Sequence, residues 1–191
     1  MPRLVNLPAD YARLGKLQRI SRHYWAFPQL RQFAYRFRLA KSFTRIEASG
    51  IGRSIETYSA FTKLFLTYTA YEQLIPSAAR LRVTGVSPIS TNVIHNKQLT
   101  KRIRANTTLK NYFLNSQLEG WLKKRLQHMY NETDDDIICF AYAIRSLYAH
   151  GELTSTDIGT GLARERKVIT DTADEILNYC DTIFSKCMDK L

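Results

Sequence analysis

The feature that most restricts the fold of this chain is the recurrence of large apolar residues three and four positions apart. A long patterned segment of this kind follows the glycine residues near position 50 and continues as far as Pro76. Its regularly spaced apolar positions are Ile55, Tyr58, Phe61, Phe65, Tyr68 and Leu74. A repeat close to 3.6 residues places such side chains along one face of an α-helix. The spacing therefore predicts a core helix from about residue 55 to Pro76.

The same spacing recurs elsewhere and indicates the fold class. Two helices are predicted on either side of Pro28, and others over residues 114–130, 137–150 and 168–187. Long helices without a comparable strand pattern indicate an all-α protein, an antiparallel up-and-down helical bundle. With 191 residues, the chain is long enough to form one domain with a substantial core. We therefore expect a single domain over residues 1–191 that begins with a helical extension.

The helical pattern is lost in the middle of the chain. Residues 83–96 are rich in Val, Thr, Gly, Ser, Pro and Asn, and a basic run that includes Lys101, Arg102 and Arg104 follows them. We therefore predict a loop insertion over about residues 77–112. Its basic residues either border a groove that binds nucleic acid or only solvate the insertion, and the sequence leaves both alternatives open.

The net charge of +11 is concentrated in the first part of the chain. Residues 1–118 hold 19 Lys and Arg against 4 Asp and Glu, whereas residues 119–191 hold 9 against 13. A basic surface attracts polyanions and raises their rate of encounter. Nucleic acid is therefore the leading partner class, ahead of an acidic protein partner or an anionic membrane surface.

Other classes of protein are excluded by what the sequence lacks. No apolar stretch approaches the roughly 20 residues that cross a bilayer, and Met1 opens no signal-peptide pattern, so we expect a cytoplasmic protein without a membrane partner. The odd number of cysteines, without close pairs, indicates reduced core residues. Spacings typical of metal ligands and glycine-rich nucleotide-binding motifs are also missing, so we expect neither a metal nor a cofactor.

The densest basic and aromatic segment lies within the first 50 residues. Its cations are Arg31, Arg36, Arg38, Lys41 and Arg45, and they alternate with Phe33, Tyr35, Phe37 and Phe43. In one interpretation the cations hold RNA phosphates while exposed rings stack on bases. In the other, the segment is an amphipathic helix with a solvated basic face. Both alternatives stay open.

A short motif stands at the end of the predicted helix over residues 137–150. Three acidic residues from Asp134 onward suit the start of that helix, and Gly151 suits a left-handed end. Just before Gly151 the sequence contains Arg145, four intervening residues and His150. This arrangement resembles the signature of the HEPN family, in which Arg and His close a bundle helix before the last helix.

The HEPN resemblance implies a helical bundle that acts as a metal-independent endoribonuclease, commonly as a homodimer. It implies that Arg145 and His150 are catalytic and that the protein is a toxin, with a cognate antitoxin, or a phage-defence effector. Two positions depart from the family pattern. Ser146 stands where Asn, Asp or His often follows the Arg, and Glu152 replaces the Tyr that an adenylylating antitoxin modifies in some toxins of the family. Regulation by that route is therefore not expected.

Secondary candidates accompany the motif. Glu119 and Lys123 match an acidic-x3-Lys pattern of some HEPN clades, although Glu and Lys four residues apart also form ordinary surface pairs on helices. Tyr148 and Tyr142 could stack on RNA or serve the core or an interface. Ser146 can donate and accept a hydrogen bond.

The residue types of the motif suit RNA cleavage. Histidine can take or give a proton near neutral pH, and the guanidinium group of arginine stays charged and grips phosphate oxygens. The expected product ends in a 2′,3′-cyclic phosphate. Five positions along an ideal helix separate Arg145 and His150 by roughly 140°. We therefore expect the helix end to unwind if both side chains of one copy serve one phosphate.

Two other functions fit the same sequence. A HEPN-like bundle without catalysis could bind RNA or another protein. A basic DNA-binding regulator would require a helix-turn-helix pair, and no convincing pair is present.

Overall fold

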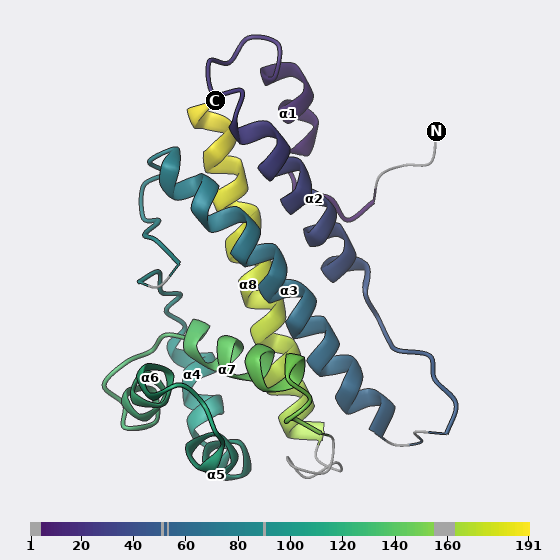
Figure 1. Cartoon of the computed structure of the whole chain (residues 1–191), viewed down its shortest axis with the longest axis vertical. Helices are drawn as coiled ribbons and strands as arrows, with labels where there is room; N and C mark the ends of the chain where they lie inside the picture. The colour runs from purple at the N-terminus through teal and green to yellow at the C-terminus, as the bar shows by residue number, and fades with distance from the viewer. Residues whose placement is uncertain (1–4, 51, 53, 90, 155–162) are drawn as a thin grey trace. The chain divides into compact units, whose positions relative to one another are not determined.

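The protein is all-α, as predicted. The computed structural model describes residues 5–50, 52, 54–89, 91–154 and 163–191 (Figure 1). Its helices are α1 (Tyr11–Leu17), α2 (Ala26–Ser42), α3 (Ser54–Arg80), α4 (Lys97–Arg104), α5 (Thr107–Asn115), α6 (Gly120–Tyr130), α7 (Ile138–Ala149) and α8 (Ala163–Lys190). These ranges contain no strand, and their β-type pairing is one isolated bridge between His95 and Asp136.

The chain divides into two compact units, where the sequence analysis treated it as one domain. Unit 1 comprises Met1–Phe43, Leu66–Asn92 and Glu175–Leu191, and unit 2 comprises Thr44–Phe65 and Val93–Asp174. The helices α3 and α8 each supply residues to both units.

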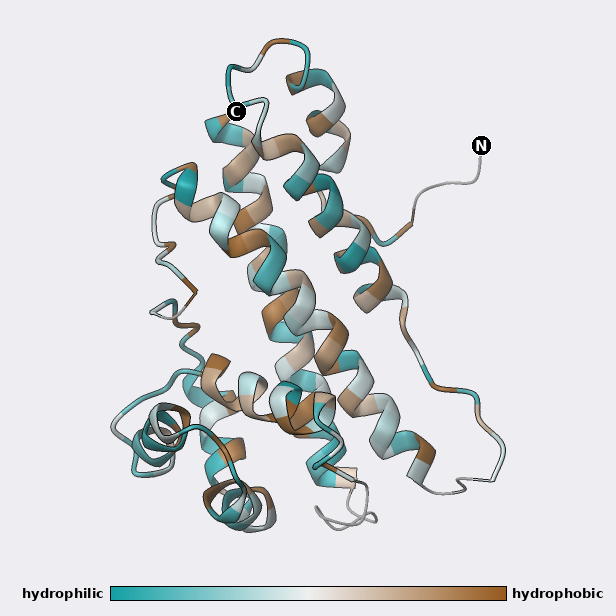
Figure 2. Cartoon of the chain, viewed as in Figure 1, coloured by the Kyte–Doolittle hydropathy of each residue, from teal (hydrophilic) through white to brown (hydrophobic). Residues whose placement is uncertain are grey.

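The helix α2 is an integral part of the core of unit 1, although the sequence analysis treated it as an extension. It buries Phe27, Leu30, Phe33, Ala34, Phe37 and Ala40. The ring of Phe33 lies 5.4 Å from that of Phe184 in α8 and 5.6 Å from that of Phe37. Hydrophobic and hydrophilic residues alternate along this helix in the manner of an amphipathic segment (Figure 2). The apolar face of α2 therefore covers α8 within this unit.

Helix directions in unit 1 follow from the length of the connections. In Figure 1, α2 runs opposite to α3, whereas the parts of α3 and α8 in this unit run in the same direction. Four helices lie between α3 and α8 in the sequence, so the chain has room to return and begin α8 from the same end. The short helix α1 is held to α8 because Asp181 accepts a hydrogen bond from the Ala9 amide at 2.8 Å, and Arg13 pairs with Asp189 at 2.9 Å.

The helix α3 continues past Pro76, where the sequence pattern predicted its end. It runs to Arg80. A proline inside a helix removes one backbone hydrogen bond and crowds the preceding turn. Pro76 is exposed, so water can satisfy the carbonyl that it leaves without a donor.

The predicted loop insertion is only partly a loop. The described residues 81–89 and 91–96 form no helix, but residues 77–80 belong to α3, and α4 and α5 cover most of residues 97–112, so the prediction was wrong for those parts. Asparagine residues cap both helices: the Asn96 side chain accepts from the Leu99 amide and that of Asn106 accepts from the Leu109 amide. The link between α4 and α5 is also tied to α8, because Asn106 donates to Glu165 at 2.9 Å.

Unit 2 combines the short helices α4 to α7 with parts of α3 and α8, and an aromatic contact lies in its core. The rings of Phe113 in α5 and Phe140 in α7 meet edge to face at 5.6 Å. The helix predicted over residues 114–130 is divided, because the backbone becomes extended at Ser116 and α6 begins only at Gly120. The helical spacing of apolar residues therefore continues in the sequence across Ser116, where the backbone leaves the helix.

The three cysteines are buried core residues, as the sequence analysis expected. Burial raises the pKa of the Cys187 thiol to about 12 and also raises the pKa of the Cys139 and Cys180 thiols. Among the described residues, no helix combines the length and apolar character needed to cross a membrane.

Candidate nucleic-acid site

The start of α7 is fixed by a buried carboxylate. Asp136 is fully buried, and its Oδ1 accepts hydrogen bonds from the amides of Ile94 and Ile138, each at 3.0 Å. Its Oδ2 pairs with Arg125 of α6. Burial raises the pKa of this carboxyl, while the two amides and Arg125 act against that rise. Of the three acidic residues predicted to serve this helix start, Asp136 does so, because it accepts from the first amide of α7; it also joins residues 93–96 and α6 to that helix.

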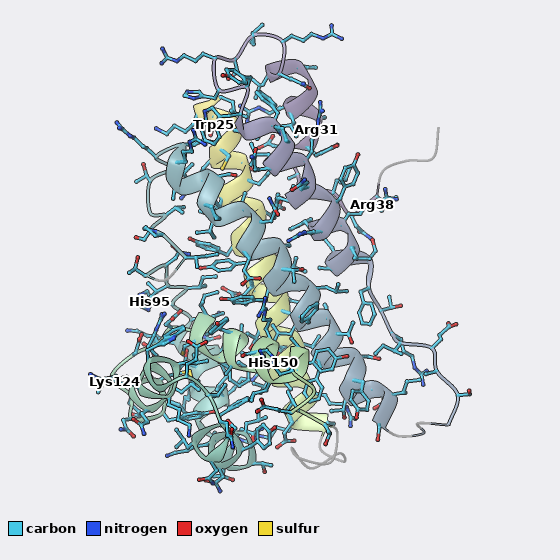
Figure 3. The ribbon with its side chains drawn as sticks, viewed as in Figure 1. Trp25, Arg31, Arg38, His95, Lys124 and His150 are labelled. Atoms are coloured by element: carbon cyan, nitrogen blue, oxygen red, sulfur yellow. The ribbon has the colours of Figure 1, made fainter. Side chains whose placement is uncertain are left out.

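The end of α7 is closed by a glycine cap, as predicted. Gly151 has a φ of +72°, and its amide donates to Tyr148 O at 3.1 Å. The Glu152 amide donates to Leu147 O at 2.9 Å. This pair of bonds is the Schellman motif, in which a left-handed residue satisfies the last carbonyls of a helix. His150 is the C-cap residue and is exposed, and Figure 3 places it at this end of α7.

The expected unwinding of the helix end does not occur. The His150 amide donates to Ser146 O at 3.1 Å, which is a regular helical bond. The chain leaves the helix only at Gly151, after His150. The Arg145 and His150 side chains therefore start roughly 140° apart around the α7 axis. Arg145 is half-buried, whereas His150 is exposed.

The two tyrosines of α7, Tyr148 and Tyr142, make different contacts. The Tyr148 hydroxyl shares a hydrogen bond of 2.8 Å with Thr62, and its ring lies 5.6 Å from that of Phe61. Tyr148 thus packs against α3 within unit 2, which matches the core alternative of the sequence analysis. Tyr142 stacks on Trp121 of α6 at 5.5 Å with an angle of 24° between the rings. Trp121 is 47% exposed, so this stack lies at the surface.

The secondary candidates Glu119 and Lys123 are not brought together as an ion pair among the described residues. The Glu119 carboxylate accepts a hydrogen bond from the indole N–H of Trp121 instead. Its carbonyl accepts from the Lys123 amide at 3.0 Å, which belongs to the first turn of α6. Glu119 therefore holds the exposed indole of Trp121.

The basic segment of α2 has fewer exposed rings than are needed for the interpretation in which its rings stack on RNA bases. Phe33 and Phe37 are fully buried and cannot stack on bases, so that part of the interpretation was wrong, whereas Tyr35 is 60% exposed. Arg31 bonds to Gln18, and Arg36 donates to Thr69 O at 3.2 Å. The other cations on this helix are Arg38 and Lys41, of which Lys41 lies 5.2 Å from the Phe37 ring, and Figure 3 labels Arg31 and Arg38. Arg45 is exposed and belongs to unit 2.

The second basic run divides into structural and surface residues. Arg104 donates to Met129 O at 2.5 Å and Asp134 O at 2.7 Å, and it also pairs with Asp135 at 3.0 Å. Its side chain is 15% exposed, so it fixes the connection between α6 and α7 and is not available to bind RNA as predicted. Lys101 is exposed.

Arg102 belongs to a cluster of cations that the sequence analysis did not identify. Arg102, Arg164 and Lys167 border one hollow of about 320 Å³ in unit 2. Arg102 pairs with Asp171 at 2.5 Å, and Lys167 pairs with the same carboxylate at 3.3 Å. Arg102 stands more than 60 positions before Arg164 and Lys167, so no local pattern could indicate that it meets them.

Compared with protein-family models, with curated proteins and with solved structures, the chain matches none of them. The HEPN resemblance therefore depends on the residues of the motif and on the helix that carries them.

Proposed function

We propose that this protein is a metal-independent endoribonuclease of the HEPN type, in which Arg145 and His150 act on the RNA phosphate. The observation that carries the proposal is the exposed His150 at the capped end of α7, about 1.4 turns after the half-buried Arg145. We place its action in the cytoplasm, as a toxin or a phage-defence effector whose activity an antitoxin or another acidic protein could restrain.

Metal-independent RNA cleavage needs a base, an acid and a positive charge beside the phosphate. A base takes the proton of the 2′-hydroxyl, the 2′-oxygen attacks the adjacent phosphorus, and the bond from phosphorus to the 5′-oxygen breaks. An acid protonates the leaving 5′-oxygen, so the products are a 2′,3′-cyclic phosphate and a 5′-hydroxyl. His150 can supply the base or the acid, and Arg145 can stabilise the charge that develops on the phosphate oxygens.

The regular helical geometry at the end of α7 favours a homodimer for this chemistry. Because Arg145 and His150 of one copy diverge, one chain alone is poorly suited to surround a phosphate. A twofold axis would bring two Arg–His pairs together and supply a separate acid and base.

Cations outside the motif would hold the rest of the RNA. Exposed Lys101 and the hollow bordered by Arg102, Arg164 and Lys167 offer phosphate contacts in unit 2. Unit 1 adds the basic surface of α2, where the candidates are Arg31, Arg36, Arg38 and Lys41.

A second candidate function is a non-catalytic module that binds RNA or an acidic protein. The observation that favours it is the same regular helix end, which keeps the two motif side chains apart. The two functions differ in one outcome, the cleavage of RNA.

The test compares wild type with His150→Ala, Arg145→Ala and Arg145→Lys on total RNA in EDTA, followed by analysis of the 3′ ends. His95→Ala is the matched control, because His95 is also an exposed histidine of unit 2. We expect wild type and the control to yield cyclic phosphate ends, and the three motif variants to lose at least a hundredfold in rate while keeping their circular dichroism spectra. Equal behaviour of all five proteins would refute the catalytic proposal. RNA binding without cleavage by wild type would then favour the module.

A further inference from the structure

A polar hollow in unit 2 lies directly beyond the motif. It has a volume of about 710 Å³ and is open to solvent. This volume falls within the range of roughly 300 to 1,000 Å³ that is usual for sites of small organic groups. Its walls come from α5, from the residues just after α5 and from Glu152.

One face of α5 supplies most of the polar groups. Thr108, Asn111 and Asn115 are spaced three and four residues apart, so they share a side of the helix. Leu109 and Phe113 are fully buried on the other side and fix the rotation of α5. The amide groups therefore face the hollow as a consequence of how α5 packs.

The hollow is joined to the motif by a hydrogen bond. The Tyr112 hydroxyl donates to Glu152 O at 2.7 Å, which ties α5 to the backbone two residues after His150. Two residues span at most about 7 Å between Cα atoms. The Glu152 wall of the hollow therefore lies within the length of one nucleotide of His150, although His150 itself does not line the hollow.

The chemistry of the walls indicates the class of ligand. The described residues that line the hollow include no Lys or Arg, and the Glu152 carboxylate repels anions, so a phosphate is a poor occupant. Asparagine and glutamine amides each offer a donor and an acceptor, which matches the edge of a nucleobase. The Tyr112 ring is held by its hydroxyl and by an edge contact of 5.8 Å with Phe113, so it can serve as a fixed wall for stacking.

We propose that this hollow binds an unpaired base of single-stranded RNA next to the scissile phosphate and so sets the sequence preference of cleavage. The inference rests on the proposed function, because it assigns the hollow to the same substrate. Asn111 and Asn115 are the specificity-determining residues, and neither takes part in proton transfer.

Two measurements test the proposal. The first titrates fluorescent hexaribonucleotides A6, C6, G6 and U6 into His150→Ala, alone and combined with Asn111→Ala or Asn115→Ala. The second maps the cleavage positions that wild type and the single Asn variants produce in total RNA. Gln127→Ala is the matched control, because Gln127 is an exposed amide of α6 outside the hollow.

We expect His150→Ala to bind one homopolymer most tightly, and the Asn variants to weaken that binding about tenfold, as loss of one base contact implies. Where wild type cleaves, the same variants should cut with a flattened base preference, whereas Gln127→Ala should retain both properties. Unchanged base preference in the Asn variants would overturn the assignment of the hollow even if Arg145 and His150 prove catalytic. Absence of any hexamer binding would also overturn it. Base-selective binding without cleavage would support the hollow and refute only the ribonuclease.

Discussion

Units 1 and 2 are both helical and both bury aromatic rings, but the polar contacts inside each unit differ. In unit 1, rings of α2 and α8 pack against each other, with Phe33 and Phe184 in the core. In unit 2, two polar side chains bind the backbone of neighbouring segments: Asp136 accepts from two amides, and Arg104 donates to two carbonyls. An apolar core tolerates substitutions that conserve its volume, whereas a buried polar contact is lost when either partner is replaced. Unit 2, which carries the motif, therefore combines its apolar core with polar contacts that a single substitution can break.

The largest expected effect is in the core of unit 1. Phe33→Ala should lower the free energy of unfolding by about 4 kcal/mol, because it removes a fully buried ring from between Phe37 and Phe184. Urea denaturation followed by circular dichroism measures this loss. Tyr35→Ala on the exposed side of α2 serves as the control, and a loss there as large as that of Phe33→Ala would contradict the assignment of these two faces.

The next largest effect tests the polar support of unit 2. Asp136→Ala removes the acceptor of two buried amides and the carboxylate that pairs with Arg125, and we expect a loss of about 3 kcal/mol. This is near the lower end for a broken buried pair, since the Arg125 side chain is 22% exposed. Hydrogen exchange should show the loss of protection in α6 and α7.

The control for Asp136 is Asp174, which pairs with Lys63 and whose side chain is 53% exposed. A surface pair of this kind contributes at most about 1 kcal/mol. If Asp174→Ala destabilised unit 2 as much as Asp136→Ala, burial would not be the reason for the effect of Asp136.

A smaller effect is expected at the end of α7. Gly151→Ala places a Cβ on a residue with a φ of +72°, which costs about 1 kcal/mol, although no other heavy atom lies within 4 Å of that position. Thermal unfolding measures this change. Gly15→Ala in α1 is the control, because Gly15 has no positive φ and the added Cβ has open space, so it should not destabilise the protein.

The last prediction involves no substitution and compares the two units directly. Cys180 and Cys187 belong to unit 1 and Cys139 to unit 2, and burial raises the pKa of all three thiols. None should react with a thiol reagent while the protein is folded. As urea is added, Cys139 should react first, because the short helices of unit 2 depend on polar contacts. Earlier reaction of Cys180 would reverse the comparison.

The sequence predicted the features that depend on local pattern. The spacing of Ile55, Phe61 and Phe65 indicated α3, and Gly151 indicated the end of α7. The caps of α4 and α5 were missed, because Asn96 and Asn106 stand in a polar stretch that also resembles a loop. The division at Ser116 was missed for the opposite reason, since an apolar period continued across it.

The candidate site was less accessible to sequence analysis than the fold. Arg145 and His150 could be proposed as a pair because they are close in the chain. Arg104 was assigned to RNA because a basic run carries no sign that one member reaches Met129 O and Asp134 O. The meeting of Arg102 with Arg164 and Lys167 could not be predicted, because it depends on how α4 packs beside α8 within unit 2.

The hydrogen bonds from Arg104 to the connection before α7 have a consequence for the order of folding during synthesis. Its partners Met129 and Asp134 follow it by 25 and 30 residues, so these bonds can form soon after that connection leaves the ribosome. The contact between Phe33 and Phe184 joins α2 to α8 and must await the synthesis of α8. We therefore expect nascent chains to place α7 and its motif before the core of unit 1 closes.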